Sequence, residues 1–81
     1  MIKIVSLANA GTVAPTQWFG TTDKGESVYI RYRWGRLRVC WDPSLKTIFE
    51  KVLTTEPDGY MEYDQLKAIL AGEFELPERE T

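Results

Sequence analysis

The sequence predicts an α+β fold in which an antiparallel sheet of three to four strands carries two helices on one face. Three observations support this prediction. Aromatic and β-branched residues, divided by glycine-containing turns, fill residues 16–41, a pattern typical of an antiparallel β-meander. Apolar residues at helical spacing follow at 45–53 and again at 66–70. A sheet with one apolar face and helices with one apolar stripe each bury these surfaces by packing together.

We expect the 81 residues to form a single domain, because a chain of this size needs nearly all its large apolar residues for one core. The meander is expected at about residues 2–41, the helical part at about 43–72 and a short C-terminal tail at 73–81. A first strand over residues 2–7 precedes a break that contains Gly11 and Pro15.

Period-two alternation sorts the strands at 27–34 and 36–41 into two faces. One face is apolar, and its members are Val28, Ile30, Tyr32, Trp34, Leu37, Val39 and Trp41. The other face is the candidate binding site, which we call the basic face: Tyr29, Arg31, Arg33, Arg36 and Arg38.

Two helices are expected in the second half of the chain. Asp42 caps the first helix and Pro43 occupies its first turn, and the stripe that follows is Leu45, Ile48, Phe49, Val52 and Leu53. Pro57 ends this helix. A second helix over about 63–71 stops at Gly72. In the tail, Phe74 and Leu76 are expected to fold back onto the core, while residues 78–81 fray.

Composition excludes several classes of enzyme. The chain has no histidine, so it lacks an imidazole for proton transfer, for nucleophile activation or for metal binding. Its single cysteine, Cys40, cannot close an intramolecular disulfide, and we expect it to be a small buried residue. We therefore expect no enzymatic activity, no catalytic residue, no cofactor and no metal.

The same features favour a location in the cytoplasm. The absence of a possible disulfide suits a reducing compartment. Residues 4–10 are too short for a signal peptide, which needs an apolar region of about 7–15 residues after a basic one. No apolar run approaches the roughly 20 residues of a membrane-spanning helix, so we expect no membrane partner.

Charge is divided unevenly along the chain. Residues 1–41 hold six basic and two acidic side chains, a balance of +4, whereas residues 42–81 hold four basic and ten acidic ones, a balance of −6. The basic face is either a contact for phosphates or carboxylates or a charged surface that keeps an exposed sheet soluble. The low isoelectric point of about 5.0 counts against nucleic acid as the partner.

The acidic half offers an alternative binding surface. Its members are Glu50, Glu56, Asp58, Glu62 and Asp64. Carboxylates on a rigid surface can imitate the phosphates of DNA and attract a DNA-binding protein. The same run is also consistent with an ordinary solvated helix face.

Residues 54–65 resemble a decayed EF-hand loop between two helices. Calcium needs oxygen ligands at the first position and a bidentate glutamate at the last, and here these positions are Thr54 and Gln65. An ordinary helix-loop-helix without a metal ion is therefore the expectation.

The segment TQWFGTTDKGESVYIRYRWGRLRV, with Ala14 and Pro15 before it, resembles a sheet segment of small proteins from phages and bacterial mobile elements. Among these, short acidic chains without catalytic residues are similar to anti-CRISPR proteins. This resemblance implies a non-enzymatic inhibitor that binds a bacterial CRISPR-Cas effector or a similar nucleoprotein defence complex and masks its functional, DNA-binding surface. It assigns no residue, because these families share no common motif.

Two alternatives remain open at the level of sequence. The arginines could bind nucleic acid directly, as a small nucleic-acid-binding protein would. The chain could instead be a structural or virion accessory protein that associates with itself through an edge strand. The sequence does not fix the oligomeric state.

Overall fold

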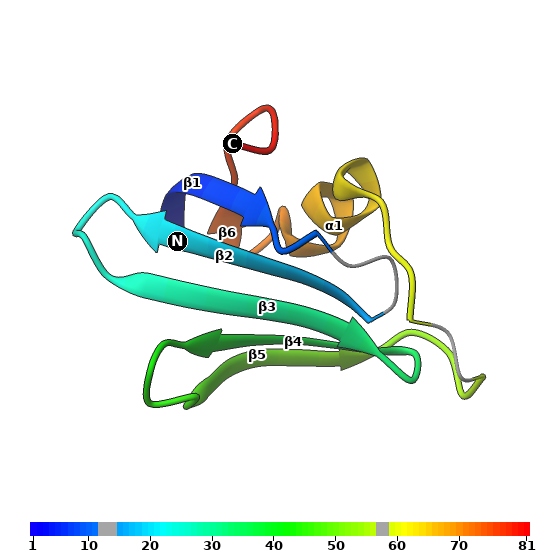
Figure 1. Ribbon diagram of the computed structural model, residues 1–81. Coiled ribbons are helices and arrows are strands. Elements are labelled where there is room, and N and C mark those ends of the chain that lie inside the picture. The colour runs from blue at the N-terminus through cyan, green and yellow to red at the C-terminus, as the bar shows by residue number, and fades with distance from the viewer. Residues whose placement is uncertain (12–14, 57–58) are drawn as a thin grey trace.

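The computed structural model describes residues 1–11, 15–56 and 59–81 (Figure 1). Within these residues the chain forms six strands and one short helix. The strands are β1 (Ile2–Asn9), β2 (Thr16–Thr22), β3 (Ser27–Arg33), β4 (Arg36–Trp41), β5 (Thr47–Val52) and β6 (Phe74–Glu75), and the helix is α1 (Tyr63–Leu70).

The six strands form one sheet in the order β5-β4-β3-β2-β1-β6. Neighbouring strands from β1 to β5 are antiparallel, whereas β6 runs parallel to β1. The sheet curls into a half-barrel with α1 beside its β6 end (Figure 1). Its two outermost strands approach through their side chains, because the ring of Phe49 on β5 meets that of Phe74 on β6 edge-on at 5.9 Å between centroids.

The core fills the inner side of this curl. Trp18, Ile30 and Val39 lie side by side across β2, β3 and β4 and are fully buried. Leu66 and Leu70 of α1 join the same cluster, so the helix covers part of the inner face. Burial of large aliphatic and aromatic side chains is the main source of stability in a domain of this size.

The predicted α+β fold with two helices packed on a sheet is wrong, because the described chain is mostly β with a single short helix. The segment 45–53, predicted to be the first helix, contains β5 instead. Asp42 and Pro43 form a turn rather than a helix start. The amide of Leu45 donates to the Trp41 carbonyl at 2.7 Å and the amide of Trp41 donates to the Lys46 carbonyl at 3.0 Å, which returns the chain alongside β4.

A register shift explains why helical spacing was misleading here. Between Val39 and Cys40 the pairing partner moves from Phe49 to Thr47, so Ile48 is an extra residue, as in a β-bulge. Ile48 and Phe49 are consecutive in sequence, yet both pack against the core. Two adjacent apolar residues on one side imitate a helical stripe, although β-branched and aromatic residues favour a strand.

The expected helix-loop-helix at 54–65 is also wrong, because β5 and not a helix precedes this segment. Pro57 and Asp58 lie outside the described residues. Among the residues that are described, no group of three or more metal-ligating side chains could hold a metal ion. In the same residues no helix has the length and apolar character to cross a membrane.

Most strand predictions are confirmed. The meander strands lie at 16–22, 27–33 and 36–41, and the first strand extends through Asn9. The second predicted helix is confirmed as α1, and Cys40 is buried as expected. The exception on the apolar face is Trp34, which is 63% exposed in the turn between β3 and β4.

The tail folds back over its whole length. Phe74 is buried in β6 and Leu76 packs against the core, as predicted. Residues 78–81 were expected to fray, but Thr81 is bound to β1: its amide donates to the Leu7 carbonyl at 2.8 Å, and the Leu7 amide donates to the Thr81 hydroxyl at 2.6 Å. The Trp18 indole N–H donates to Glu80 Oε2 at 3.0 Å, which satisfies a buried polar group.

Candidate anion-binding groove

Strand register gathers the four arginines of the basic face. Arg31 on β3 lies opposite Arg38 on β4, and Arg33 lies opposite Arg36. Residues directly opposite in an antiparallel pair project to the same side of the sheet. The sequence prediction that these four side chains share one face, away from the core, is therefore consistent with the observed pairing.

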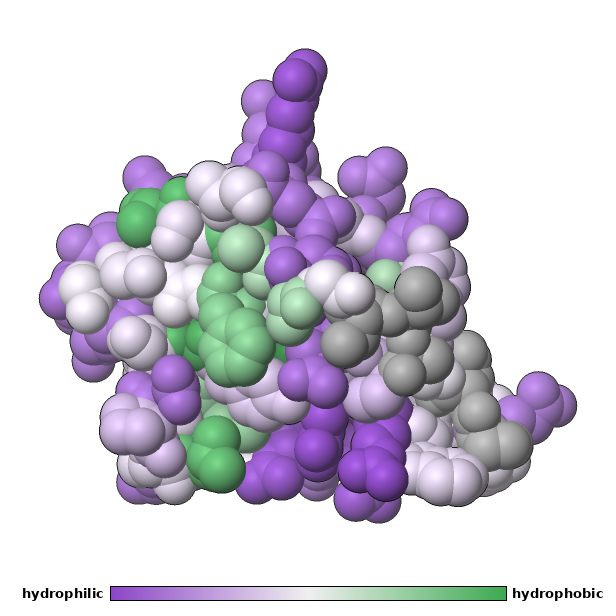
Figure 2. All heavy atoms as spheres, in the orientation of Figure 1, coloured by the Kyte–Doolittle hydropathy of each residue, from purple (hydrophilic) through white to green (hydrophobic). Residues whose placement is uncertain are grey.

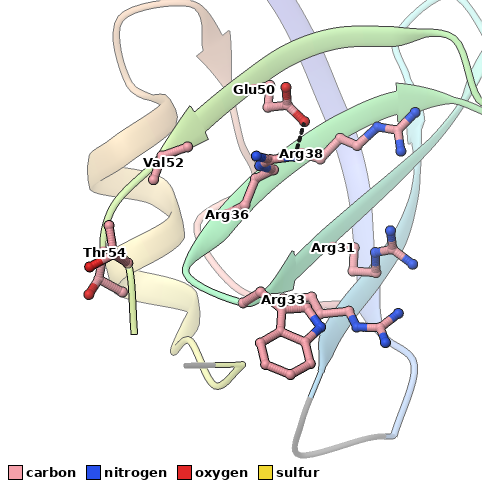
Figure 3. Close-up of a pocket in the computed structure, with 9 residues that line it drawn as sticks. Arg31, Arg33, Arg36, Arg38, Glu50, Val52 and Thr54 are labelled. Atoms are coloured by element: carbon pink, nitrogen blue, oxygen red, sulfur yellow. Dashed lines mark ion pairs between the residues drawn. The ribbon is translucent and has the colours of Figure 1, made fainter. Parts of the chain in front are cut away.

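The next strand adds the border of the site. On β5, Glu50 lies opposite Arg38 and Val52 lies opposite Arg36. Together with the four arginines and with Trp34, Thr54 and Thr55, these residues line an open hollow of about 500 Å³, which we call the arginine groove (Figure 3). Figure 2 shows strongly hydrophilic atoms gathered over β4 and β5 near the β3–β4 turn.

A tight turn positions one end of the arginine groove. Trp34 and Gly35 have positive φ angles of 56° and 70°, as required by a two-residue hairpin turn with both central residues in the left-handed region. The Gly35 carbonyl accepts hydrogen bonds from the amides of Leu53 and Thr54. A Cβ on Gly35 would lie 2.2 Å from the Thr54 carbonyl oxygen, so only glycine allows this approach. The turn thus holds Thr54 at the groove and leaves Trp34 exposed.

The four guanidinium groups differ in how they are held. Arg38 is anchored, because its Nε donates to Thr47 Oγ1 at 2.8 Å and its Nη2 donates to the Leu45 carbonyl at 3.3 Å. Arg36 forms a long ion pair with Glu50 at 3.9 Å between two exposed side chains, an interaction that contributes little free energy. The Arg33 guanidinium lies 6.0 Å from the centre of the Trp34 ring, at the limit of a cation–π contact.

Two arginines have no anionic partner among the residues that the structure describes. Neither Arg31 nor Arg33 forms a hydrogen bond or ion pair with any residue that the structure describes. In Figure 3 the guanidinium groups of Arg31, Arg33 and Arg38 extend toward the same side, whereas Arg36 turns toward Glu50. Among the described residues that line the groove, Glu50 is therefore one carboxylate beside four cationic groups. This arrangement is suited to binding carboxylates or phosphates, with which guanidinium groups form paired hydrogen bonds.

Tyr29, the fifth predicted residue, does not line the arginine groove. It lies one row further along the outer face, where its hydroxyl donates to Gln17 Oε1 at 3.0 Å and its ring stacks on Phe19 with 4.9 Å between centroids. Phe19 is 47% exposed, so an aromatic pair extends this face beyond the arginines. Sequence reasoning missed Phe19 on this face, although its alternation with the buried Trp18 is a usable signal.

The alternative acidic surface is divided in space. Glu50 lies among the arginines, Glu56 is exposed in the loop after β5, and Asp58 lies outside the described residues. Glu62 and Asp64, at the start of α1, line a separate hollow of about 340 Å³ together with Glu80. Glu50 thus lines a different hollow from Glu62 and Asp64.

Trp34, Val52, Thr54 and Thr55 are groove residues that sequence reasoning did not assign. Three of them lie in β5 or directly after it, within the segment that was expected to be helical and to end in a loop. Trp34 was expected on the buried face, but the Trp34-Gly35 pair before an arginine is itself a turn signal.

No protein-family model matches this chain, no curated protein is similar to it, and no solved structure matches its fold.

Proposed function

We propose that this protein is a non-enzymatic binding protein whose arginine groove engages an acidic surface of a partner protein. The observation that carries the proposal is the pair of strand arginines, half-buried Arg31 and exposed Arg33, that no described carboxylate neutralises. A surface that serves only for solubility mixes charges of both signs. Here four arginines stand together without a lysine.

The chemistry of arginine supports an interface. The planar guanidinium forms bidentate hydrogen bonds with carboxylates and is more weakly hydrated than an ammonium group, so it loses less on desolvation. Arginine, tryptophan and tyrosine are the residues that most often carry binding energy at protein interfaces. The arginine groove combines the first two, because Trp34 is 63% exposed beside Arg33.

We further propose that binding blocks a bacterial CRISPR-Cas or similar nucleoprotein defence complex, as expected of an inhibitor from a phage or mobile element. The charge division supports this role. The arginine groove would dock on an acidic patch next to the DNA path, and residues 42–81, with a balance of −6, would then repel DNA from the occupied surface.

Direct binding of nucleic acid is the second candidate, and Trp34 favours it. An exposed indole beside several arginines can stack on a base while the guanidinium groups hold phosphates. Such binding would weaken steeply with added salt, because counterions are released from the phosphates. The net charge of −2 opposes a general attraction to nucleic acid.

Affinity capture from bacterial lysate, with and without nuclease, tests the proposal. The tagged protein is compared with R31E/R33E and with the matched control K24E/R79E, which changes net charge equally at exposed sites outside the arginine groove. Nuclease-resistant capture that R31E/R33E loses and K24E/R79E keeps supports a protein partner. Capture that nuclease abolishes supports nucleic acid. If R31E/R33E still captures the partner and E62K/D64K does not, the acidic surface makes the contact instead of the arginine groove.

A further inference from the structure

We infer that the partner contributes an extended acidic segment that adds to β5 as a further strand, beside the arginine groove. This inference rests on the proposed function and names the form of the partner. It follows from the free edge of the sheet, the direction of the β5 backbone groups, the continuity of β5 with the arginine groove, and the charges along that edge.

The two edges of the sheet differ in whether described segments of the chain cover them. The β1 edge is covered by the chain's own C-terminal segment, because β6 pairs with Ile2 and Lys3 and Thr81 forms two backbone-directed hydrogen bonds with Leu7. The β5 edge has no such cover from any residue that the structure describes. A free edge is a template for pairing with an extended chain.

The hydrogen-bond pattern shows which β5 groups are available. The Leu53 amide donates to the Gly35 carbonyl, so residues 49, 51 and 53 direct their backbone groups toward β4, by the alternation of an antiparallel pair. The N–H and C=O of Glu50 and Val52 therefore point away from the sheet. No Cα atom of β5 lies within 8 Å of a Cα atom of α1 or β6, and a new strand needs a spacing of about 4.8 Å.

The free edge is continuous with the arginine groove. Glu50 and Val52, whose backbone groups point outward, also line the groove with their side chains. A side chain opposite Val52 on an added strand would stand two strand spacings, about 10 Å, from the backbone of Arg36. A glutamate and an arginine side chain span this distance together.

The charges of β5 define the occupant. On the added strand, an acidic residue opposite Val52 would reach Arg36. The residue after it would lie opposite Lys51, on the other face of the sheet, and should also be acidic. The residue opposite Glu50 must not be acidic, because like charges directly opposite each other destabilise the pair. A second copy of β5 does not fit this pattern. Two-fold pairing centred on Glu50 or on Lys51 sets like charges directly against each other.

The test uses the synthetic peptide Thr-Thr-Glu-Glu-Lys-Val-Thr-Thr, which places these charges in antiparallel order, and a version N-methylated at alternate positions. Amide exchange in the full chain is followed by NMR. Exchange at Glu50 and Val52 is expected to slow about tenfold when the peptide concentration is about ten times its Kd. The N-methylated peptide has the same charges but cannot pair, so it is expected to give no protection.

The variant V52P removes an outward N–H, which an edge strand tolerates, and is expected to lose the peptide while the rest of the spectrum is unchanged. If V52P does not fold, the comparison of the two peptides on the natural chain still tests strand addition. Equal binding of both peptides, or no binding, overturns strand addition. If R31E/R33E nevertheless loses capture of the partner from lysate, the proposed function stands without strand addition. Concentration-dependent protection of β5 without peptide would show that a second copy occupies the edge, which also overturns the inference.

Discussion

Arg31 on β3 and Arg38 on β4 lie directly opposite each other on the outer face of the sheet. Like charges in this position destabilise an antiparallel pair. Arg33 and Arg36 repeat the arrangement one row away, so the face holds two such pairs in succession. Packing of the core does not require these side chains, which supports a role for them in binding.

Charge reversal at Arg31 should separate binding from stability. R31E converts a like-charge pair into an opposite-charge pair with Arg38, so we expect the free energy of unfolding to be unchanged or to rise by up to about 1 kcal/mol. Partner binding should be lost. Urea denaturation and affinity capture of the same sample measure the two effects. A loss of stability of more than about 1 kcal/mol would show that Arg31 has a structural role. The control is R31Q, which removes the positive charge without creating an ion pair with Arg38.

Gly20 should resist substitution because the neighbouring strand β1 approaches it closely. A Cβ at this position would stand 2.3 Å from the Ser6 carbonyl oxygen and 2.7 Å from Leu7 Cδ1. We expect G20A to lower the free energy of unfolding by about 1–3 kcal/mol, as overpacking does. G72A is the control, since a Cβ there meets nothing within 4 Å. Equal midpoints for the two variants in thermal denaturation would refute the close approach of β1 and β2.

The contact between Glu80 and Trp18 should stabilise the tail. Trp18 is fully buried, so removal of its acceptor in E80A leaves an indole N–H unpaired at an expected loss of about 1–3 kcal/mol. E80Q keeps an amide oxygen as acceptor and should lose less. Chemical denaturation of both variants provides the measurement. An E80A protein as stable as the natural one would mean that water replaces the carboxylate at the indole.

Stability should decline at high pH through Tyr63. Burial, and then the negative charge of Glu80, raise the pKa of Tyr63 from 10.0 to about 12, while its hydroxyl donates to the Pro77 carbonyl at 2.6 Å. The folded chain therefore holds this proton more tightly than the unfolded chain does. The resulting stability is fully present below pH 10 and is lost as the pH rises toward about 12.

The variant Y63F isolates this effect. Urea denaturation of Y63F at about pH 9 and about pH 11 should show a smaller decline in stability than the natural chain shows. Equal declines would assign the pH dependence to other groups.

Local signals in the sequence were sufficient for the central sheet and for α1. Alternation in residues 27–41 placed Ile30 and Val39 inside and Arg31 and Arg38 outside, and pairing of β3 with β4 agrees with both assignments. The helix α1 combines an apolar stripe with a glycine after its end, and these two signals need no tertiary information.

The misassigned segment depended on long-range contacts. The bulge at Ile48 places two adjacent apolar residues against the core, which no local pattern distinguishes from a helical stripe. The error affected the candidate site, because Glu50 and Val52 could not be placed beside Arg38 and Arg36 without β5. Trp34 was misassigned for a related reason, since alternation was extended one residue into a turn whose φ angles are positive.

The most direct test of the arginine groove is an NMR titration of the arginine side-chain Nε–H signals with poly-glutamate, repeated with oligothymidylate. We predict that Arg31 and Arg33 shift most with poly-glutamate, because neither has a described anionic partner, and that Arg38, already bound to Thr47, shifts less. Arg79, outside the arginine groove, serves as the internal control. Equal small shifts at all arginines would contradict the account, and larger groove-specific shifts with oligothymidylate would make nucleic acid the partner.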